Sequence, residues 1–244
     1  MHPLLNIALK IVQFTSHALS REFDHMTTRP AENRAMIAKL RLAIEAKIAA
    51  RIQASYPDHR VCFPSQHNPP TAETVWFIDI LSGLNNYARA IPHFAICIAI
   101  QQQTTTVHCV IHDPMAHETF IASRNQFAQL NQFRIHVQTG KMESDTLLLA
   151  GNQVNRLPQT AIDRRQTGCN ALMLAYVANG RFDGFAGNGL SFYELSAGSL
   201  LIKMAGGAYS DLSGGNAYTQ QQELLATNPK LFKRWLQHIH HRSR

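Results

Sequence analysis

The first quarter of the chain carries apolar residues at helical spacing. From His2 to about Phe23, apolar positions recur three and four residues apart, and from about Glu32 to Ser55 one recurs at nearly every fourth position. This period places apolar side chains on one face of a helix. We therefore predict two amphipathic helices, each with one face toward a core.

The pattern changes to strands after Pro57. Apolar segments of strand length follow, and turn signals such as Asp113-Pro114 separate several of them. The predicted strands are Val75–Leu81, Pro92–Ile100, Thr106–His112, Glu118–Ala122 and Ile135–Gln138. The first half is therefore predicted to be two helices against an antiparallel sheet built from hairpins.

The second half alternates helices and strands. Predicted helices run from Gly168 to Asn179, from about Phe192 to Ala205, and onward from the cap Asn228-Pro229. The predicted strands are TLLLAG (146–151), FDGFAG (182–187), Ala208–Asp211 and Leu224–Thr227. We expect an α/β layered sandwich, with halves at residues 1–143 and 144–244 that form one compact unit.

Composition limits the class of protein. A chain of 244 residues with 45% apolar content can bury a large core. No apolar run reaches the roughly 18 residues of a membrane span, and the N-terminal segment lacks a charged leader, which predicts a cytoplasmic protein. Four scattered cysteines without metal or disulfide spacing predict free, mostly buried thiols: Cys62, Cys97, Cys109 and Cys169.

The net charge of +7 favours an anionic partner such as nucleic acid. Positive charge is concentrated near the C-terminus, at Lys230, Lys233, Arg234, Arg242 and Arg244. Such a surface suits RNA or an acidic protein face. A plain solvated helix surface is the alternative interpretation, and the sequence has no RNA-binding motif with interleaved aromatic residues.

The most informative stretch is WFIDILSGLNNY, residues 76–87. An apolar strand runs into Asp79, and the turn at Gly83 and Leu84 presents backbone N–H groups that can converge on a phosphate. A metal and phosphate site is expected at this point of the chain.

This stretch resembles the signature of the inositol monophosphatase family, W-x-I-D-P-[IL]-D-G-T-x-N-F. The frame is kept by Trp76, Ile78, Asp79, Gly83, Asn86 and Tyr87. Other segments follow in the family's order: SYPDH (55–59), VIHDPM (110–115), LAYVANGRFDGF (174–185) and YELSAGSLLIKMAGG (193–207). The resemblance spans nearly the whole chain and implies the family's layered αβαβα fold.

Family members hydrolyse phosphate monoesters with Mg²⁺ held by carboxylates, so the resemblance implies a carboxylate at each ligand position. Among these positions only Asp79 and Glu194 are acidic here, and they are expected to be vestigial ligands. The remaining matched positions have lost the family's residue, and they are Arg41, Pro64, Ser65, Ser82, Leu84 and Gly187.

Structural roles compete with metal binding at both acidic positions. Glu194 follows Ser191 by three residues, which is the spacing of a capping box. Asp79 is expected to accept hydrogen bonds from the turn at Gly83. No cofactor is therefore expected, and Mg²⁺ is expected only if residual activity exists.

The resemblance is strongest to a bacterial branch of the family that takes part in transcription antitermination and binds Nus factors and RNA polymerase. It implies a catalytically inactive scaffold for this machinery or for RNA, and a possible homodimer. Two alternatives stay open. One is a weak Mg²⁺-dependent phosphatase for inositol or sugar monophosphates that uses Asp79 and Glu194. The other is a sensor that binds a phosphorylated metabolite at Gly83 without cleaving it.

Overall fold

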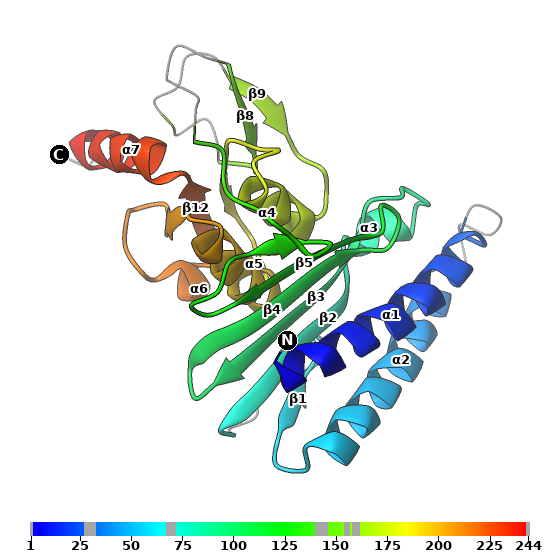
Figure 1. Ribbon diagram of the computed structural model, residues 1–244. Coiled ribbons are helices and arrows are strands. Elements are labelled where there is room, and N and C mark those ends of the chain that lie inside the picture. Colours follow the sequence, from blue (N-terminus) through cyan, green and yellow to red (C-terminus); the bar gives the residue numbers. More distant parts are fainter. Residues whose placement is uncertain are drawn as a thin grey trace.

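The structure is a computed structural model that describes residues 2–26, 33–66, 72–139, 146–153, 157 and 162–242, with side chains up to residue 238 (Figure 1). The helices are α1 (Pro3–Phe23), α2 (Asn33–Ser55), α3 (Leu84–Tyr87), α4 (Asn170–Ala178), α5 (Phe192–Met204), α6 (Tyr218–Gln221) and α7 (Pro229–Arg242).

The strands form two sheets. The first is seven-stranded, in the order β1 (Arg60–Cys62), β2 (Thr74–Ser82), β3 (Ala95–Gln102), β4 (Thr105–Asp113), β5 (Glu118–Ser123), β6 (Gln129–Leu130) and β7 (Phe133–Arg134). The second is five-stranded, in the order β11 (Ala208–Ser210), β12 (Glu223–Thr227), β10 (Gly184–Asn188), β8 (Leu147–Ala150) and β9 (Ile162–Arg165).

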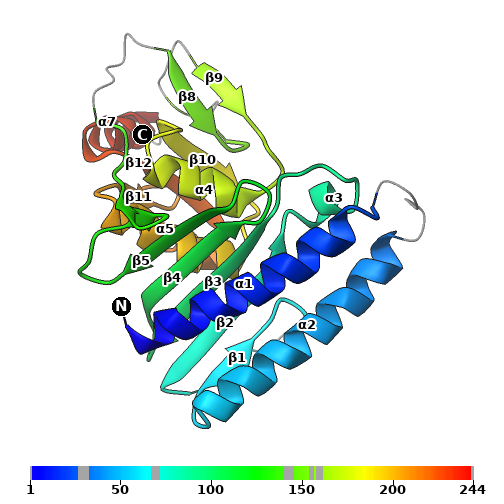
Figure 2. The same ribbon diagram turned by 45° about the vertical axis from the view of Figure 1, so that its right-hand side comes forward.

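The elements stack in five layers, which confirms the predicted αβαβα sandwich. Helices α1 and α2 lie side by side on one face of the first sheet, and α4 and α5 cover its other face (Figures 1 and 2). The second sheet follows, and α7 packs on its outer side against β11 and β12. Because α5 contacts β4 and β5, the second half of the chain packs directly on the sheet of the first half.

Strand β2 has consecutive apolar residues from Val75 to Ile78 because both faces of the strand are covered. Trp76 and Ile78 belong to the core under α1 and α2, whereas Val75 and Phe77 belong to the core under α4 and α5. Successive side chains of a strand point to opposite faces. Since helices cover both faces here, every position of the strand is buried, and this rigid central strand carries the signature residues.

One predicted strand is wrong. Residues 135–138 form no strand, because the N–H groups of Ile135 and Val137 donate to the carbonyls of Ala128 and Ala205, which lie in separate segments. The short strands β6 and β7 precede this segment. Strands β1 and β9 and helix α6 were not predicted, since three or four residues are too few for a periodic signal. Strand β1 pairs parallel with β2, so the first sheet is not wholly antiparallel.

Three further expectations concern the cysteines, membrane spans and the boundary between the two halves. The four cysteines are buried and free, as predicted. No helix in the described part of the chain is long and apolar enough to cross a membrane. The expected boundary between residues 143 and 144 lies outside the described residues, as do residues 243 and 244 and the side chain of Arg242.

Candidate active site

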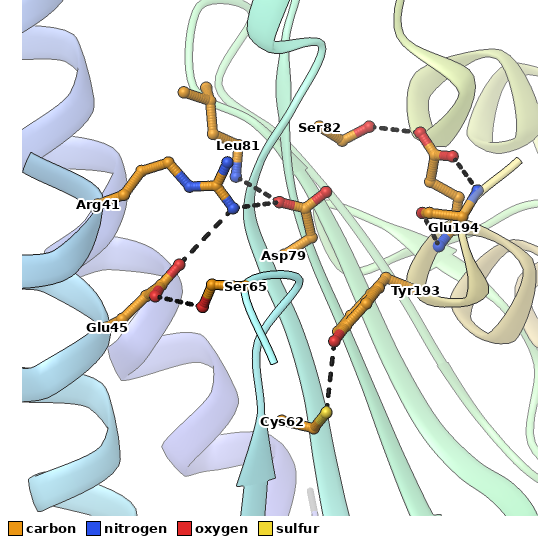
Figure 3. Close-up of polar contacts among 10 residues, drawn as sticks. Arg41, Glu45, Cys62, Ser65, Asp79, Leu81, Ser82, Tyr193 and Glu194 are labelled. Carbon is orange, nitrogen blue, oxygen red and sulfur yellow. Dashed lines mark hydrogen bonds and ion pairs between the residues drawn. The ribbon is translucent and has the colours of Figure 1, made fainter. Parts of the chain in front are cut away.

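Four segments bring polar side chains together near the end of β2 (Figure 3). Asp79 comes from β2 itself, and Arg41 and Glu45 come from the facing helix α2. Ser65 follows β1, and Glu194 lies in the first turn of α5. The structure therefore gathers several of the predicted positions into one cluster at the junction of α2, β2 and α5.

A bulge in β2 shapes this junction. Asp79 is opposite Cys97 and Ser82 is opposite Ala95, so β2 has one residue more than β3 over this interval. A bulge bends a strand and redirects its side chains. Here the N–H of Leu81 donates to Asp79 Oδ1 at 3.0 Å. The expectation that Asp79 accepts hydrogen bonds from the Gly83 turn is corrected, because this donor lies within β2.

The guanidinium of Arg41 lies between two carboxylates. Its Nη2 is 3.6 Å from Glu45 Oε1 and 4.0 Å from Asp79 Oδ1 (Figure 3). Arg41 and Glu45 are four residues apart, which places them on one face of α2. The Ser65 hydroxyl donates to Glu45 Oε2 at 3.4 Å. The chain thus supplies its own cation to the carboxylate that the resemblance assigns to a metal.

Burial dominates the electrostatics of this group. It raises the pKa of Asp79 to about 6, against the hydrogen bond from Leu81 and the charge of Arg41, which lower it. Burial also raises the pKa of Glu45, and Arg41 again opposes the shift. Both carboxylates are harder to ionise than in water, because desolvation penalises the charged form. Arg41 is the nearby charge that favours the ionised state of both carboxylates.

Glu194 is held by a separate set of donors. Its Oε1 accepts from the Ser82 hydroxyl at 2.8 Å. Its Oε2 accepts from the Ser191 N–H at 2.8 Å and from Asn170 Nδ2 at 3.3 Å. The Glu194 N–H donates to Ser191 Oγ at 3.2 Å, which completes a capping box and confirms the structural role predicted for Glu194. Both carboxylate oxygens already have partners within the protein.

This arrangement does not fit a magnesium site. Mg²⁺ requires near-octahedral oxygen ligands. Among the described residues no group of three or more His, Cys, Asp or Glu side chains is placed to hold a metal ion. The guanidinium beside Asp79 repels a second cation, and the oxygens of Glu194 accept hydrogen bonds from Ser82, Ser191 and Asn170.

The turn after β2 caps a short helix. Gly83 has a φ of +89°, and its carbonyl accepts the N–H groups of Asn86 and Tyr87. A side chain at Gly83 is disfavoured both by this left-handed φ and by the backbone of Phe94, 3.2 Å from where a Cβ would lie. Leu84 follows at the surface. Whether these N–H groups receive a phosphate stays a prediction.

The remaining predicted positions lie apart. Pro64 is exposed in the turn before Ser65. Gly187 lies in β10 of the second sheet, opposite Leu224. The basic positions are on α7, in the outermost layer, on the other side of the molecule from α2 (Figure 1). Lys230 and Lys233 are exposed and Arg234 is half-buried. The structure therefore separates the predicted partner surface from the cluster at Asp79.

Sequence reasoning missed two members of the cluster. Glu45 had a local signal, because an acidic residue four positions after Arg41 on a helix predicts an ion pair. Asn170 had none, since it reaches Glu194 from a segment that is distant along the chain. Next to the cluster, α2 and α3 enclose a largely apolar cavity of about 470 Å³, into which Leu42 and Leu84 project beside Arg34 and Arg41.

Comparison with known proteins places this geometry in a family. Residues 2–244 match the inositol monophosphatase family. The chain belongs to that family. It is 34% identical to the Nus factor SuhB of Salmonella typhimurium and of Escherichia coli K12, over 97% of this chain and 95% of each relative. The Nus factor SuhB of Pseudomonas aeruginosa is 32% identical over 96% of this chain and 94% of its own.

Solved structures of the inositol monophosphatase family share the fold. The extragenic suppressor protein SuhB of Bartonella henselae superposes with a TM-score of 0.84 at 24% identity, over 98% of this chain and 100% of that one. The Thermotoga maritima inositol monophosphatase superposes with a TM-score of 0.82 at 20% identity, over 98% of both chains. The five-layer frame described above is therefore the family's frame.

Proposed function

We propose that this chain is a non-hydrolysing inositol monophosphatase homologue that acts as a scaffold in transcription antitermination. The observation that carries the proposal is the Arg41 guanidinium, 3.6 Å from Glu45 and 4.0 Å from Asp79, where metal-dependent hydrolysis would need a divalent cation. The relatives that bear the name Nus factor SuhB support the class of partner.

The chemistry of the cluster supports the loss of hydrolysis. In metal-dependent phosphatases the ion generates a nucleophile from water and neutralises the leaving oxygen, and each effect contributes several kcal/mol. A guanidinium binds an anion but does not coordinate a water molecule and lower its pKa. The Ser82 hydroxyl donates to Glu194 at 2.8 Å, so these two side chains bond to each other.

Helix α7 supports the scaffold role. Leu231 and Trp235 are buried against the second sheet and anchor the helix. Lys230 and Lys233 are exposed on it, in a chain with a net charge of +7. An anchored helix that presents cations offers a fixed surface to RNA or to an acidic protein face.

The catalytic part is tested by phosphate release from inositol monophosphate at saturating Mg²⁺, beside a hydrolysing family member at the same concentration. We expect release at the rate without enzyme. Metal-dependent release that disappears in Asp79→Asn would establish the phosphatase alternative and refute this part. Binding of inositol monophosphate without release would support the sensor alternative instead.

The partner part is tested by biolayer interferometry of the immobilised chain with purified Nus factors, RNA polymerase and leader RNA, each offered separately. We expect saturable binding of at least one of them. For RNA, Lys230→Glu/Lys233→Glu is expected to weaken binding at least tenfold. The matched control Lys39→Glu/Arg51→Glu makes the same charge change at exposed positions of α2 and is expected to leave it intact. If none of the three binds, the scaffold proposal fails.

A further inference from the structure

A second cavity, of about 570 Å³, lies at the opposite end of the first sheet from Ser82. It is enclosed by the β3–β4 turn, α5, β11 and α6. Gln101 lines this cavity, whereas Ala95 on the same strand is paired with Ser82. Six residues of β3 separate these two positions, about 20 Å at the rise of a strand. The cavity is therefore distinct from the cluster at Asp79.

One face of α5 forms a wall of the cavity. Phe192, Ser196, Ser199 and Lys203 line it at intervals of four, three and four residues, which is the spacing of a single helix face. Ser196 is only 3% exposed, and its hydroxyl has no hydrogen-bond partner among the described residues. A buried hydroxyl without a partner costs stability, and a ligand in the cavity can supply that partner.

The lining is cationic and rich in hydroxyl groups. Arg124 and Lys203 are exposed at the cavity, and none of the described residues that line it carries a carboxylate. Hydroxyl groups come from four separate parts of the chain: α5, the β3–β4 hairpin, β11 and α6. This composition selects an anion that also carries hydrogen-bonding groups.

Two tyrosines form an aromatic part of the wall. The rings of Tyr209 and Tyr218 meet edge to face, with centroids 5.2 Å apart. The Tyr209 hydroxyl interacts with the hydroxyls of Tyr218 and Ser199, and burial raises the pKa of Tyr209 to about 12. Tyr209 therefore remains neutral at physiological pH.

A β-bulge at Val107 in β4 lies beside the cavity and shifts the register between Ile100 and Gln101.

We propose that this cavity binds a small phosphate ester that carries several hydroxyl groups. Its phosphate pairs with Arg124 and Lys203, and its hydroxyls bond to Ser196 and to the threonines of the β3–β4 turn. The volume falls in the range of small-molecule sites, about 300–1,000 Å³. Sugar phosphates and nucleoside monophosphates share this chemistry. The proposal stands independently of the scaffold function.

Isothermal titration tests the cavity with glucose 6-phosphate and uridine 5′-monophosphate as separate probes. Glucose, uridine and inorganic phosphate serve as controls. We expect at least one ester to bind saturably and at least tenfold more tightly than its parent alcohol and than phosphate. The ester that binds identifies the source of the phosphate group.

Three variants locate the binding. Arg124→Gln/Lys203→Gln is expected to weaken it at least tenfold, and Ser196→Ala severalfold. The matched control Lys39→Gln/Arg51→Gln removes the same charge from exposed positions of α2 and is expected to leave binding unchanged. Circular dichroism melting verifies that each variant is folded, which is expected because four of the five altered side chains are exposed.

Any of three results would overturn the proposal. The first is that neither ester binds. The second is that Arg124→Gln/Lys203→Gln binds as tightly as the unaltered chain, which would place the ester elsewhere, for example beside Arg41. The third is that inorganic phosphate binds as tightly as the esters, which would leave the hydroxyl groups of the cavity without a role.

Discussion

The two ends of the first sheet differ in how their polar groups are satisfied. At the Ser82 end, Arg41 forms ion pairs with Glu45 and Asp79, and the Ser82 hydroxyl donates a hydrogen bond to Glu194. At the Gln101 end, the cavity presents two cations and the hydroxyl of Ser196, which has no hydrogen-bond partner among the described residues. At the first end the charged groups pair with one another, although Glu45 Oε1 has no hydrogen bond among the described residues, whereas the second end leaves donors available. The end that carries the family signature is therefore the end at which the charged groups pair within the protein.

The difference matters because internal partners compete with ligands. A cation that binds at Asp79 must approach a guanidinium, and one that binds Glu194 competes with three hydrogen-bond donors. An anion that binds between Arg124 and Lys203 meets no carboxylate among the described lining residues. We therefore predict that the chain binds a ligand at the end of the first sheet that is remote from the family signature.

The largest expected effect comes from removing the internal cation. Arg41→Leu leaves the buried carboxylates of Glu45 and Asp79 without their positive partner, which we expect to lower the free energy of unfolding by about 3 kcal/mol. Urea denaturation measures the loss. Lys39→Leu, at an exposed position on the same helix, is the control and is expected to change stability by less than about 0.5 kcal/mol.

A second variant sharpens that prediction. In Arg41→Leu/Asp79→Asn, one of the two carboxylates that lost their partner is replaced by a neutral amide. Part of the lost stability is therefore expected to return. If Arg41→Leu were as stable as the parent, Arg41 would not be the internal partner of these carboxylates.

The next effect concerns pH and the face of the sheet covered by α1. Burial lowers the pKa of His112 to about 4, and nearby His117 adds to the shift, which the Glu118 backbone opposes. Its ring nitrogens bond to Ser16 of α1 and to Thr119. A lowered histidine pKa contributes stability that is present above pH 6.5 and is lost as the pH falls toward 4. We expect about 3 kcal/mol of loss from this residue as the pH falls from 7 to 4.

The pH curve separates this face from the cluster at Asp79. The ring of His108 lies beside that of His2, with centroids 4.4 Å apart. Burial lowers the pKa of His108 to about 4 as well, so it acts in the same direction as His112. Asp79 acts in the opposite direction, because its raised pKa gives stability at low pH that is lost as the pH rises through about 6. Urea unfolding between pH 4 and 7 gives the free energy of unfolding at each pH. We expect its rise with pH to be shallower in His112→Gln and steeper in Asp79→Asn than in the unaltered chain. Unchanged slopes in both variants would contradict these assignments.

The smallest effect is a matched pair of serines. Ser82→Ala removes the donor to Glu194 and is expected to cost about 1 kcal/mol. Ser196→Ala removes a buried hydroxyl that has no hydrogen-bond partner in the described part of the chain, and it is expected to leave stability unchanged or slightly increased. Urea unfolding of both variants tests the contrast between the two ends of the sheet. An equal loss in both would show that the Ser196 hydroxyl has a partner of its own.

The fold could be predicted from the sequence where the pattern of apolar residues is long and periodic. Helices α1 and α2 and strands β2 to β5 follow from apolar spacing. The segment at residues 135–138 was misassigned because its N–H groups are satisfied across separate segments, which no local pattern records. Strand β9 has four residues, and only its pairing with β8 defines it.

The candidate site was accessible in part. The family signature located Asp79, and the serine three residues before Glu194 indicated the cap. What Arg41 does could not be derived, because its contact with Asp79 depends on how α2 packs across β2. The cavity at the other end joins Arg124, Ser196 and Tyr218, which are distant along the chain and belong to no common motif.

The most direct test of the central claim is isothermal titration of Mg²⁺ into the purified chain, with the hydrolysing Thermotoga maritima relative as a positive control. Because Arg41 supplies the cation beside Asp79 and Glu194 already accepts three hydrogen bonds, we predict no saturable binding at millimolar Mg²⁺. Saturable binding that is lost in Asp79→Asn would contradict the account and would show that the family's metal site still operates in this chain.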